Sequence, residues 1–516
     1  MAGVAVTQTL NGNHCRTIEE LTTRTETSAV ARATPVRIGE GWLGLPFDAD
    51  GYDPQGIALS GQVSLTYDEV DASLDQMQGM LARRGIRPGD VVSLQFRDEL
   101  LHALHLMAVG RSGATAFGIP KTATSMQRIR MMQEVGSSLV LGDNPDEASE
   151  IGYVFVTMPP DGPANPCPVV AECAPHGAWL IINSSGSTGK PKLIPVDHQT
   201  LRNRLQLYID ALGKSRQDRV ASLSSLDLPS TKNQMLSTLF AGGAYMFKTS
   251  ESQALGTFLR EERITVLYTT PVHLHQLLMV SPKDMKTLRA VVAAGAPIGA
   301  GLRHKFREAF GDILFVRYGT SESGPISDAA PADAVRIDGT VGKAINGVQI
   351  DILSADGTPM PPNAPGRICV RSPGLFGGYV GQAPAITKED GFITGDRGFL
   401  TVDGHLVHQG REDDMMIMNG VNIYPAELEQ TLSEHPAIAA VIVRPMRHDI
   451  LDAVPVAFVQ LMPGSQISER EVLHFCQVRL GARAARHVII LDRIPRNESG
   501  KPDRAVLDSL LAGVGR

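Results

Sequence analysis

The sequence predicts a layered α/β protein whose C-terminal part is a smaller α+β unit. From Ile57 onward, short apolar segments of strand length alternate with amphipathic helical segments, which is typical of a largely parallel sheet covered on both faces. After about residue 411 this rhythm gives way to a compact set of helices and strands. Of 516 residues, 43% are hydrophobic and 20% charged, which is enough apolar material for a core and excludes disorder or a coiled coil as the main architecture.

In the large part, residues 67–84 carry apolar side chains at helical spacing and predict a helix. Pro88-Gly89-Asp90 then predicts a turn into a strand over residues 91–96. Strand, helix and strand are next expected over residues 288–293, 301–310 and 313–318.

The small part is expected to hold helices over residues 425–432 and 469–480. Strands are expected over residues 437–443, 454–461 and 488–491. We place the boundary between the two units at residues 411–413, which gives domains 1–411 and 412–516. Residues 1 to about 40 show only a weak hydrophobic periodicity, and we expect them to form a loosely ordered N-terminal segment.

The charge balance argues against a nucleic acid or an anionic membrane as a partner. Lys and Arg total 48 against 55 for Asp and Glu, a net charge of −7. The five cysteines form no C-x-x-C pair, which disfavours a disulfide framework and a zinc site and favours a reducing compartment. With no secretory leader or membrane span in the sequence, the expected location is the cytoplasm.

The strongest motif is a run of small, hydroxylated and basic residues after the apolar segment Ile181-Ile182. Small residues let backbone N–H groups converge on a phosphate, hydroxyls add donors, and lysines neutralise charge. The run comprises Ser184, Ser185, Gly186, Ser187, Thr188, Gly189, Lys190, Pro191 and Lys192. It is not a Walker A loop, which needs Gly where Ser184 stands and Ser or Thr where Pro191 stands. A flexible surface turn is the alternative reading of such a run.

A second motif, Tyr318-Gly319-Thr320-Ser321-Glu322-Ser323-Gly324, follows the strand predicted over residues 313–318. Ligands of open α/β sheets bind at the carboxyl ends of the strands. A tyrosine here can stack on a flat ring, hydroxyls can donate to phosphate, and Glu322 can hold Mg²⁺. The segment is not a G-x-S-x-G hydrolase elbow, because Ser323 occupies the last position.

Two further segments carry charged groups in short loops. Asp396, in Thr394-Gly395-Asp396, can accept hydrogen bonds from ribose hydroxyls, and Arg411 can bind phosphate or ribose. Near the end of the chain, Lys501 in a Ser-Gly-Lys loop can bring a positive charge to a transition state. Each segment taken alone also reads as an ordinary solvated turn.

In this order and spacing, the four segments resemble the acyl-adenylate-forming superfamily, which includes acyl- and aryl-CoA synthetases, peptide-synthetase adenylation domains and firefly luciferase. The resemblance covers about Ile57 to the end. It implies a large domain that binds ATP and an acid, and a small domain that turns between an adenylating and a thioester-forming pose. The implied reaction converts acid and ATP·Mg²⁺ to acyl-AMP and pyrophosphate, after which a thiol attacks.

The resemblance also implies roles for individual residues. Lys501, Glu322, Thr188 and Lys192 would act in catalysis, with Glu322 the Mg²⁺ ligand and Asp413 the hinge. The ATP site would comprise Ser184, Ser185, Gly186, Ser187, Thr188, Gly189, Gly295, Ala296, Pro297, Tyr318 (stacked on adenine), Gly319, Thr320, Ser321, Asp396 and Arg411. The chain departs from the family pattern at three places. Leu193 stands where the family loop commonly has Gly, Ser321 where it often has Thr, and Ile417-Met418 lacks a lysine that many relatives carry. None of these departures removes a catalytic group.

The acid pocket is expected to be built by residues 222–234, with Ala294, Gly295 and Gly324. When positions are counted along the sequence without an alignment, Asp227 falls on the gate position of CoA ligases and Leu228 on the amine-binding position of peptide synthetases. A shift of one residue in that count would reverse the two assignments. Lys232 and Asn233 are expected to face a polar group of the acid, although Lys232 pointing to solvent is an equal alternative.

Residues 420–429 resemble stand-alone CoA ligases, and Asn419 and Gly420 would line the pantetheine tunnel. Because only 15 residues follow Lys501, the thiol is expected to come from CoA or from the phosphopantetheine of a separate carrier protein. The leading hypothesis is an AMP-forming acid–CoA ligase. The alternatives are a stand-alone biosynthetic enzyme that loads a carrier protein and an inert nucleotide-binding scaffold. The acid and the oligomeric state, a homodimer included, are left open.

Overall fold

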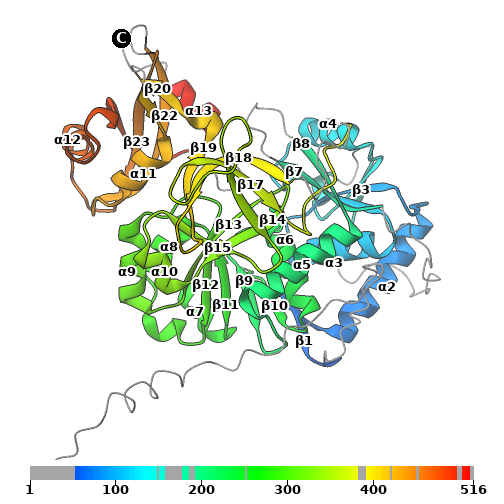
Figure 1. Ribbon diagram of the computed structural model, residues 1–516. Helices are drawn as coiled ribbons and strands as arrows, with labels where there is room; N and C mark the ends of the chain where they lie inside the picture. Colours follow the sequence, from blue (N-terminus) through cyan, green and yellow to red (C-terminus); the bar gives the residue numbers. More distant parts are fainter. Residues whose placement is uncertain are drawn as a thin grey trace, which may run out of the picture.

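A computed structural model describes residues 53–147, 150, 152–156, 177–184, 192–249, 253–381, 391–418, 421–448, 452–496 and 502–511. The described chain forms three sheets with helices packed on them (Figure 1). Two large sheets share the N-terminal part, and a small sheet belongs to the C-terminal part.

The first large sheet has six strands and is parallel except at one edge, where β8 runs antiparallel to β7. Helices α3 (Glu99–Arg111) and α4 (Ser125–Val135) connect its strands, as parallel pairing requires. In spatial order the strands are β6 (Tyr153–Phe155), β5 (Leu139–Gly142), β3 (Val91–Gln95), β4 (Thr115–Gly118), β7 (Ala178–Ser184) and β8 (Lys192–Asp197).

The second large sheet has thirteen strands, parallel in its middle and antiparallel toward both edges. In spatial order they are β16 (Gln349–Leu353), β17 (Gly366–Arg371), β18 (Phe392–Leu400), β19 (Leu406–Arg411), β15 (Thr340–Ala344), β14 (Gly324–Ala329), β13 (Leu314–Thr320), β12 (Ala290–Ala294), β11 (Val266–Thr269), β9 (Arg219–Ser222), β10 (Ala244–Met246), β1 (Ile57–Ser60) and β2 (Ser64–Thr66). The helices between these strands are α2 (Tyr67–Arg83), α5 (His198–Leu212), α6 (Pro229–Phe240), α7 (Leu255–Glu261), α8 (Pro271–Leu277), α9 (Ala300–Phe310) and α10 (Pro331–Arg336).

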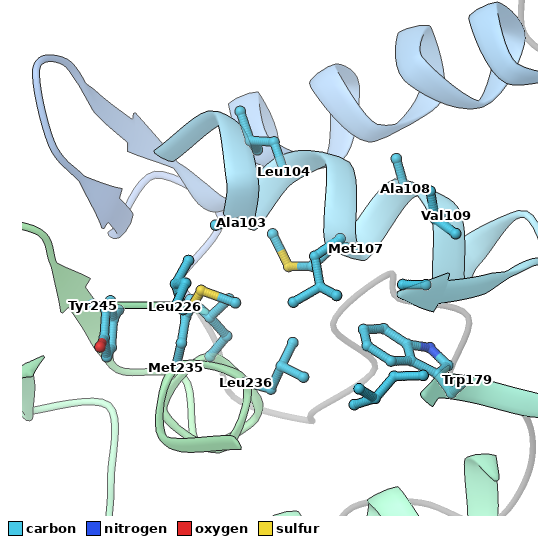
Figure 2. Packing of buried hydrophobic residues seen from close by; sticks show 14 of the residues in the cluster. Ala103, Leu104, Met107, Ala108, Val109, Trp179, Leu226, Met235, Leu236 and Tyr245 are labelled. Atoms are coloured by element: carbon cyan, nitrogen blue, oxygen red, sulfur yellow. The ribbon is translucent and has the colours of Figure 1, made fainter. Parts of the chain in front are cut away.

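One continuous core joins the two large sheets, and α3 lies at its centre (Figure 2). Its residues from Leu100 to Arg111 are all buried, so this helix is covered on every side. The close approach of α3 to β7 depends on Gly110, because a Cβ atom there would lie 2.2 Å from the ring of Trp179. The same core continues to α6 through Met235 and Leu236.

The C-terminal part has a separate core and its own sheet, which Figure 1 shows in orange at the upper left. The sheet order is β21 (Val421–Ile423), β20 (Met416–Met418), β23 (Asp452–Leu461) and β22 (Ile438–His448), with β24 (His487–Leu491) also paired to β23. Its helices are α11 (Pro425–Ser433), α12 (Glu469–Leu480) and α13 (Arg504–Leu511). The chain passes from β19 of the large sheet to β20 of the small one through residues 412–415, next to the predicted boundary.

The layered α/β class and most of the predicted elements are confirmed. The helix predicted over residues 469–480 is α12, and the helix predicted over residues 67–84 is α2. The largest difference is β22, which runs five residues beyond the predicted end because it pairs with β23 along its whole length. Of the described helices, none is both long and apolar enough to cross a membrane.

Candidate active site

A cavity of about 710 Å³ opens where the carboxyl ends of β11, β12 and β13 meet β18, β19 and the small domain. The parallel strands deliver their following loops to this edge, which is where open α/β sheets bind ligands. Its walls include Ala294, Gly295, Ala296, Pro297, Gly319, Thr320, Ser321, Glu322, Gly324, Thr394, Gly395, Asp396, Arg411 and Asp413, together with Glu429, Arg496 and Pro502 of the small domain. Six separate stretches of the sequence therefore meet at one site.

The loop after β13 is held in shape by its own hydroxyl groups. The backbone N–H of Ser323 donates to Oγ1 of Thr320 over 3.2 Å, and the two hydroxyl oxygens lie 3.0 Å apart. Gly324 has a φ of +74°, and a Cβ atom there would lie 3.1 Å from Cγ of Arg204. The tight turn presents Thr320 and Glu322 to the cavity.

The Glu322 carboxylate is bonded to a tyrosine whose ring has a lysine near it. Oε1 of Glu322 accepts a hydrogen bond of 3.0 Å from the hydroxyl of Tyr379. The ammonium group of Lys192 lies 4.9 Å from the centre of the Tyr379 ring, a cation–π distance. Burial, followed by the charge of Glu322, raises the pKa of Tyr379, so its proton remains available for this hydrogen bond.

Arg204 of α5 fixes the backbone of the same loop from behind. Its side chain is 1% exposed, and it donates to the carbonyl oxygens of Gly374 (2.7 Å) and Glu322 (2.6 Å). Burial lowers its pKa to about 10, which still leaves it charged at neutral pH. A buried cation bonded to carbonyls brings positive potential to the wall nearest Glu322.

Elsewhere in the cavity wall, Asp396 has three donor groups near it. Its Oδ2 accepts from the hydroxyl of Tyr318 over 2.6 Å, while Nε2 of His408 lies 3.8 Å and Nη1 of Arg411 lies 3.9 Å from Oδ1. Burial alone would raise the pKa of Asp396, but the hydrogen bond and charge of His408, the Tyr318 hydroxyl and Arg411 together lower it. The carboxylate is therefore ionised and ready to accept hydroxyl donors.

Tyr318 occupies a different place from most residues of its motif. Its ring lies beneath the cavity wall, 5.3 Å from the His408 ring centre, and it does not line the cavity itself. In this arrangement Tyr318 supports Asp396, and adenine stacking on its ring stays a prediction.

Charged residues also connect the two domains at the predicted hinge. Nη2 of Arg411 lies 3.7 Å from Oδ2 of Asp413. The neighbouring Asp414 pairs with both terminal nitrogens of Arg504 on α13, at 2.6 and 2.5 Å. The segment thus touches the ligand wall on one side and the last helix on the other.

Helix α6 forms the inner wall of the cavity, and here the structure corrects two predictions. Leu228 and Asn233 line the cavity, whereas Asp227 and Lys232 do not. Oδ2 of Asp227 accepts from the backbone N–H of Lys121, and its Oδ1 lies 3.9 Å from Nδ1 of His102, both on the far side of the wall. The expectation that Asp227 and Lys232 meet the acid directly is therefore wrong.

Lys232 also does not point to solvent, because its side chain is only 3% exposed. Its ammonium donates to the carbonyl oxygens of Leu226 and Asp227, the residues that lead into α6. Burial lowers its pKa to about 8, with the charges of Asp227 and Glu99 opposing the shift. Lys232 thus holds the loop that presents Leu228 to the cavity.

Several predicted residues lie outside the described part of the chain. These are Ser185, Gly186, Ser187, Thr188, Gly189, Lys190, Asn419, Gly420 and Lys501, and only the backbone of Ser184, at the end of β7, is described. Arg496 and Pro502, the described residues that flank Lys501 along the chain, both line the cavity. The roles predicted for the undescribed residues stay predictions.

The site residues that the sequence did not predict include Arg204, Tyr208, Tyr379 and His408. Arg204 had a signal, since it falls on the apolar face of α5 between Leu201 and Tyr208, where an unpaired cation would be costly. Tyr379 and His408 had no signal in the sequence. The partner of Tyr379 is Glu322, 57 residues away, and the partner of His408 is Asp396, on the neighbouring strand.

The walls suit the ATP and Mg²⁺ that the family resemblance implies. Lys192 and Arg411 line the cavity and can balance phosphate charge, Arg204 adds positive potential from behind the loop, and Asp396 can take ribose hydroxyls. Among the described residues there is no cluster of three or more metal-binding side chains. A single carboxylate, Glu322, is nevertheless enough for Mg²⁺, which keeps several waters and is held largely by substrate phosphates.

Comparisons with known proteins point the same way. The family model described as AMP-binding enzyme matches residues 48–380, and the model described as AMP-binding enzyme C-terminal domain matches residues 427–501. The chain is 28% identical over 495 residues to 4-coumarate–CoA ligase 3 from Oryza sativa subsp. japonica, covering 88% of this chain and 89% of that protein. It is also 28% identical over 469 residues to 2-succinylbenzoate–CoA ligase from Bacillus subtilis (strain 168), covering 87% and 94%.

The fold is similar to solved structures of comparable length. ATP-bound MatB from Rhodopseudomonas palustris superposes with a TM-score of 0.81 at 23% identity, covering 90% of this chain and 97% of that one. The o-succinylbenzoate CoA synthetase from Bacillus subtilis in complex with AMP gives a TM-score of 0.80 at 25% identity, covering 88% and 95%.

Proposed function

The chain belongs to the AMP-binding enzyme family, and from that premise we propose that it is an AMP-forming acid–thiol ligase that activates a carboxylic acid with ATP and passes the acyl group to CoA. The predicted membership of the acyl-adenylate-forming superfamily is confirmed by the two matching family models. Full-length relatives that are CoA ligases support CoA as the thiol.

One observation carries the proposal. A single cavity is bounded by Glu322, Asp396 and Arg411 of the large domain and by Arg496 and Pro502 of the small domain. The first three suit a metal–nucleotide complex, and the last two flank Lys501. The position of these two neighbours of Lys501 supports its predicted role at the nucleotide.

In the first half-reaction a carboxylate oxygen of the acid attacks the α-phosphorus of ATP. The new P–O bond forms as the bond between the α-phosphorus and the bridging oxygen breaks, and pyrophosphate leaves. Both reactants are anions, so cationic groups must offset their repulsion as they approach. We assign this role to Lys501, with Lys192 and Arg204 on the phosphate side; Glu322 would hold Mg²⁺, which would supply further positive charge.

In the second half-reaction the thiolate sulfur of CoA attacks the carbonyl carbon of acyl-AMP. A C–S bond forms, the C–O bond to AMP breaks, and AMP leaves. The small domain carries both Lys501 and the predicted thiol-tunnel residues Asn419 and Gly420. We therefore propose that it turns about Asp413 between the two half-reactions.

Mass spectrometry tests the proposal. The protein is incubated with ATP, Mg²⁺, CoA and a pooled panel of aryl, short-chain, hydroxy, dicarboxylic and amino acids. We expect an acyl-CoA and AMP in equal amounts, both dependent on ATP. Acyl-AMP that accumulates without a CoA ester would instead identify a carrier protein as the acceptor, and ATP left intact with every acid would overturn the proposal.

A further inference from the structure

Helix α11 of the small domain contacts β19 and α9 of the large domain. One face of the helix makes this contact, because the residues involved recur at intervals of four and three positions. These residues are Ala426, Gln430 and Ser433. Each of them lies against a glycine of the large domain. At Gly410 an added Cβ atom would lie 3.2 Å from the first of them, at Gly339 3.7 Å from the second, and at Gly299 it would overlap the hydroxyl oxygen of the third.

Gly299 differs from the other two glycines in its backbone. Gly339 and Gly410 have φ values of +68° and +120°, which residues with a side chain rarely adopt. Gly299 has a φ of −63° and a ψ of 150°, which suit any residue. It also stands directly before α9, where serine or aspartate would cap the helix better than glycine does. The contact with α11 is therefore the constraint that keeps a side chain out of position 299.

Rotation of one side chain would not make room for a residue larger than glycine. The hydroxyl of Ser433 can turn away only by losing its 2.7 Å hydrogen bond to the carbonyl oxygen of Gln430. Cβ of Ser433 would still lie 3.2 Å from the added Cβ atom, closer than the roughly 3.5–4.0 Å at which carbon atoms pack. Helix α11 would therefore have to move away from α9, and the small domain, which has its own core, would move with it.

This contact lies at the active-site cavity. Gly299 and Ser433 both line it, and so do Arg496 and Pro502, which flank Lys501 along the chain. Docking of α11 and the approach of the Lys501 segment therefore belong to one pose of the small domain. In an inference that rests on the proposed function, we propose that Gly299 is a positioning residue for acyl-AMP formation. Its lack of a side chain admits Ser433, and so sets the share of molecules in which the small domain is docked.

A pair of cysteines measures docking without any substrate. Gly301→Cys and Glu434→Cys are introduced together, because a Cβ atom at position 301 would lie 3.7 Å from Cα of Glu434 across the same contact. The rate at which diamide links the two cysteines, followed by mass spectrometry of the joined peptides, reports how often α11 is docked on α9. We expect this rate to fall at least about fivefold with Gly299→Ala and further with Gly299→Val, since both overpack the contact.

A compensating change on α11 shows whether the contact itself is responsible. Ser433→Gly removes the two nearest atoms that an added Cβ would meet, and leaves the carbonyl oxygen of Gln430 at 3.6 Å. Combined with Ser433→Gly, Gly299→Ala should therefore link the cysteines within about twofold of the rate of Ser433→Gly alone, as coupled sites do. Gly377→Ala, where the added atom meets nothing within 4 Å, is the control and should keep the full rate.

The two half-reactions connect docking to catalysis. With the acid that gives the most acyl-CoA in the pooled panel, Gly299→Val should slow acyl-AMP formation at least about fivefold and spare thioester formation from supplied acyl-AMP. Linking as fast in Gly299→Val as with glycine, a loss that Ser433→Gly does not restore, or equal loss in both half-reactions would overturn the inference and leave the ligase function intact. An unmodified chain that forms no acyl-AMP from any acid would overturn the proposed function, whereas the linking rates would still decide whether Gly299 controls docking.

Discussion

The hydroxyl of Tyr318 donates a 2.6 Å hydrogen bond to Oδ2 of Asp396, a residue 78 positions further along the chain. This bond connects β13, which ends at the phosphate side of the cavity, to β18, which carries the predicted ribose-binding carboxylate. The orientation of Asp396 therefore depends on a residue from another motif.

Tyr318→Phe keeps the ring and removes only this donor. We expect the KM for ATP in pyrophosphate exchange to rise roughly fivefold with little change in kcat, because a hydrogen bond of about 1 kcal/mol would no longer orient Asp396. Tyr153→Phe removes a phenol from the distant six-stranded sheet and is the matched control. An unchanged KM for ATP in Tyr318→Phe would show that Asp396 is positioned by other groups.

Lys501→Ala should nearly abolish formation of acyl-AMP and spare formation of the thioester from supplied acyl-AMP. The reason is that the positive charge is needed only while two anions approach. Each half-reaction is assayed separately by mass spectrometry, with Lys283→Ala on the surface of the large domain as the control. Equal loss in both half-reactions would refute the predicted role of Lys501.

Asp413→Pro should have the opposite effect. Proline fixes φ near −65° and would hold the hinge in the pose in which Arg496 and Pro502 line the cavity. We expect acyl-AMP formation close to that of the unmodified protein and thioester formation slowed by at least about tenfold, since turnover depends on the domain movement. Thioester formation at an undiminished rate would exclude Asp413 as the hinge.

Glu429→Gln should change how stability depends on pH. Burial raises the pKa of Glu429 from 4.5 to about 7, and Asp414 adds to the shift. A raised carboxyl pKa contributes stability below pH 4.5 that is lost as the pH rises toward 7. Glutamine cannot ionise and can still accept from the backbone N–H of Val443, so the variant should gain at most about 3 kcal/mol relative to the unmodified protein between pH 4.5 and pH 8.

Urea unfolding of both proteins at the two pH values measures this difference. Glu261→Gln, an exposed change on α7, should show no such gain. A stability difference for Glu429→Gln that is the same at both pH values would contradict the prediction.

Gly110→Ala should destabilise the large domain by about 1–3 kcal/mol, the usual cost of overpacking a core. The added Cβ would lie 2.2 Å from the Trp179 ring, which cannot move away because it is fully enclosed. Chemical denaturation followed by Trp fluorescence gives the change in unfolding free energy. Gly377→Ala, where the added atom meets nothing within 4 Å, is the control and should be near neutral.

Local patterns predicted the architecture well because strand and helix periodicities are local properties. Helix α12 follows from its spacing of apolar residues, and Asp396, Arg411 and Glu322 reach one cavity because they lie on, or directly after, strands of one sheet. The end of β22 was missed because its last residues form a strand only through pairing with β23.

The acid pocket was predicted less well for a physical reason. Whether a residue of α6 faces the cavity depends on the rotation of the helix, and successive helical residues point about 100° apart. Asn233 therefore faces the cavity while Lys232 turns back to the preceding loop. No local pattern reveals that rotation, since it is set by packing of α6 against α3 and α5.

The buried position of α3 has a consequence for how the molecule comes apart. Its side chains belong to a core that draws on both large sheets, so neither sheet keeps a complete interior without the other. The small domain, by contrast, encloses its own set of apolar residues. Calorimetry should therefore show one cooperative unfolding transition for the two large sheets together and a second, smaller transition for the small domain. The three sheets thus unfold as two units.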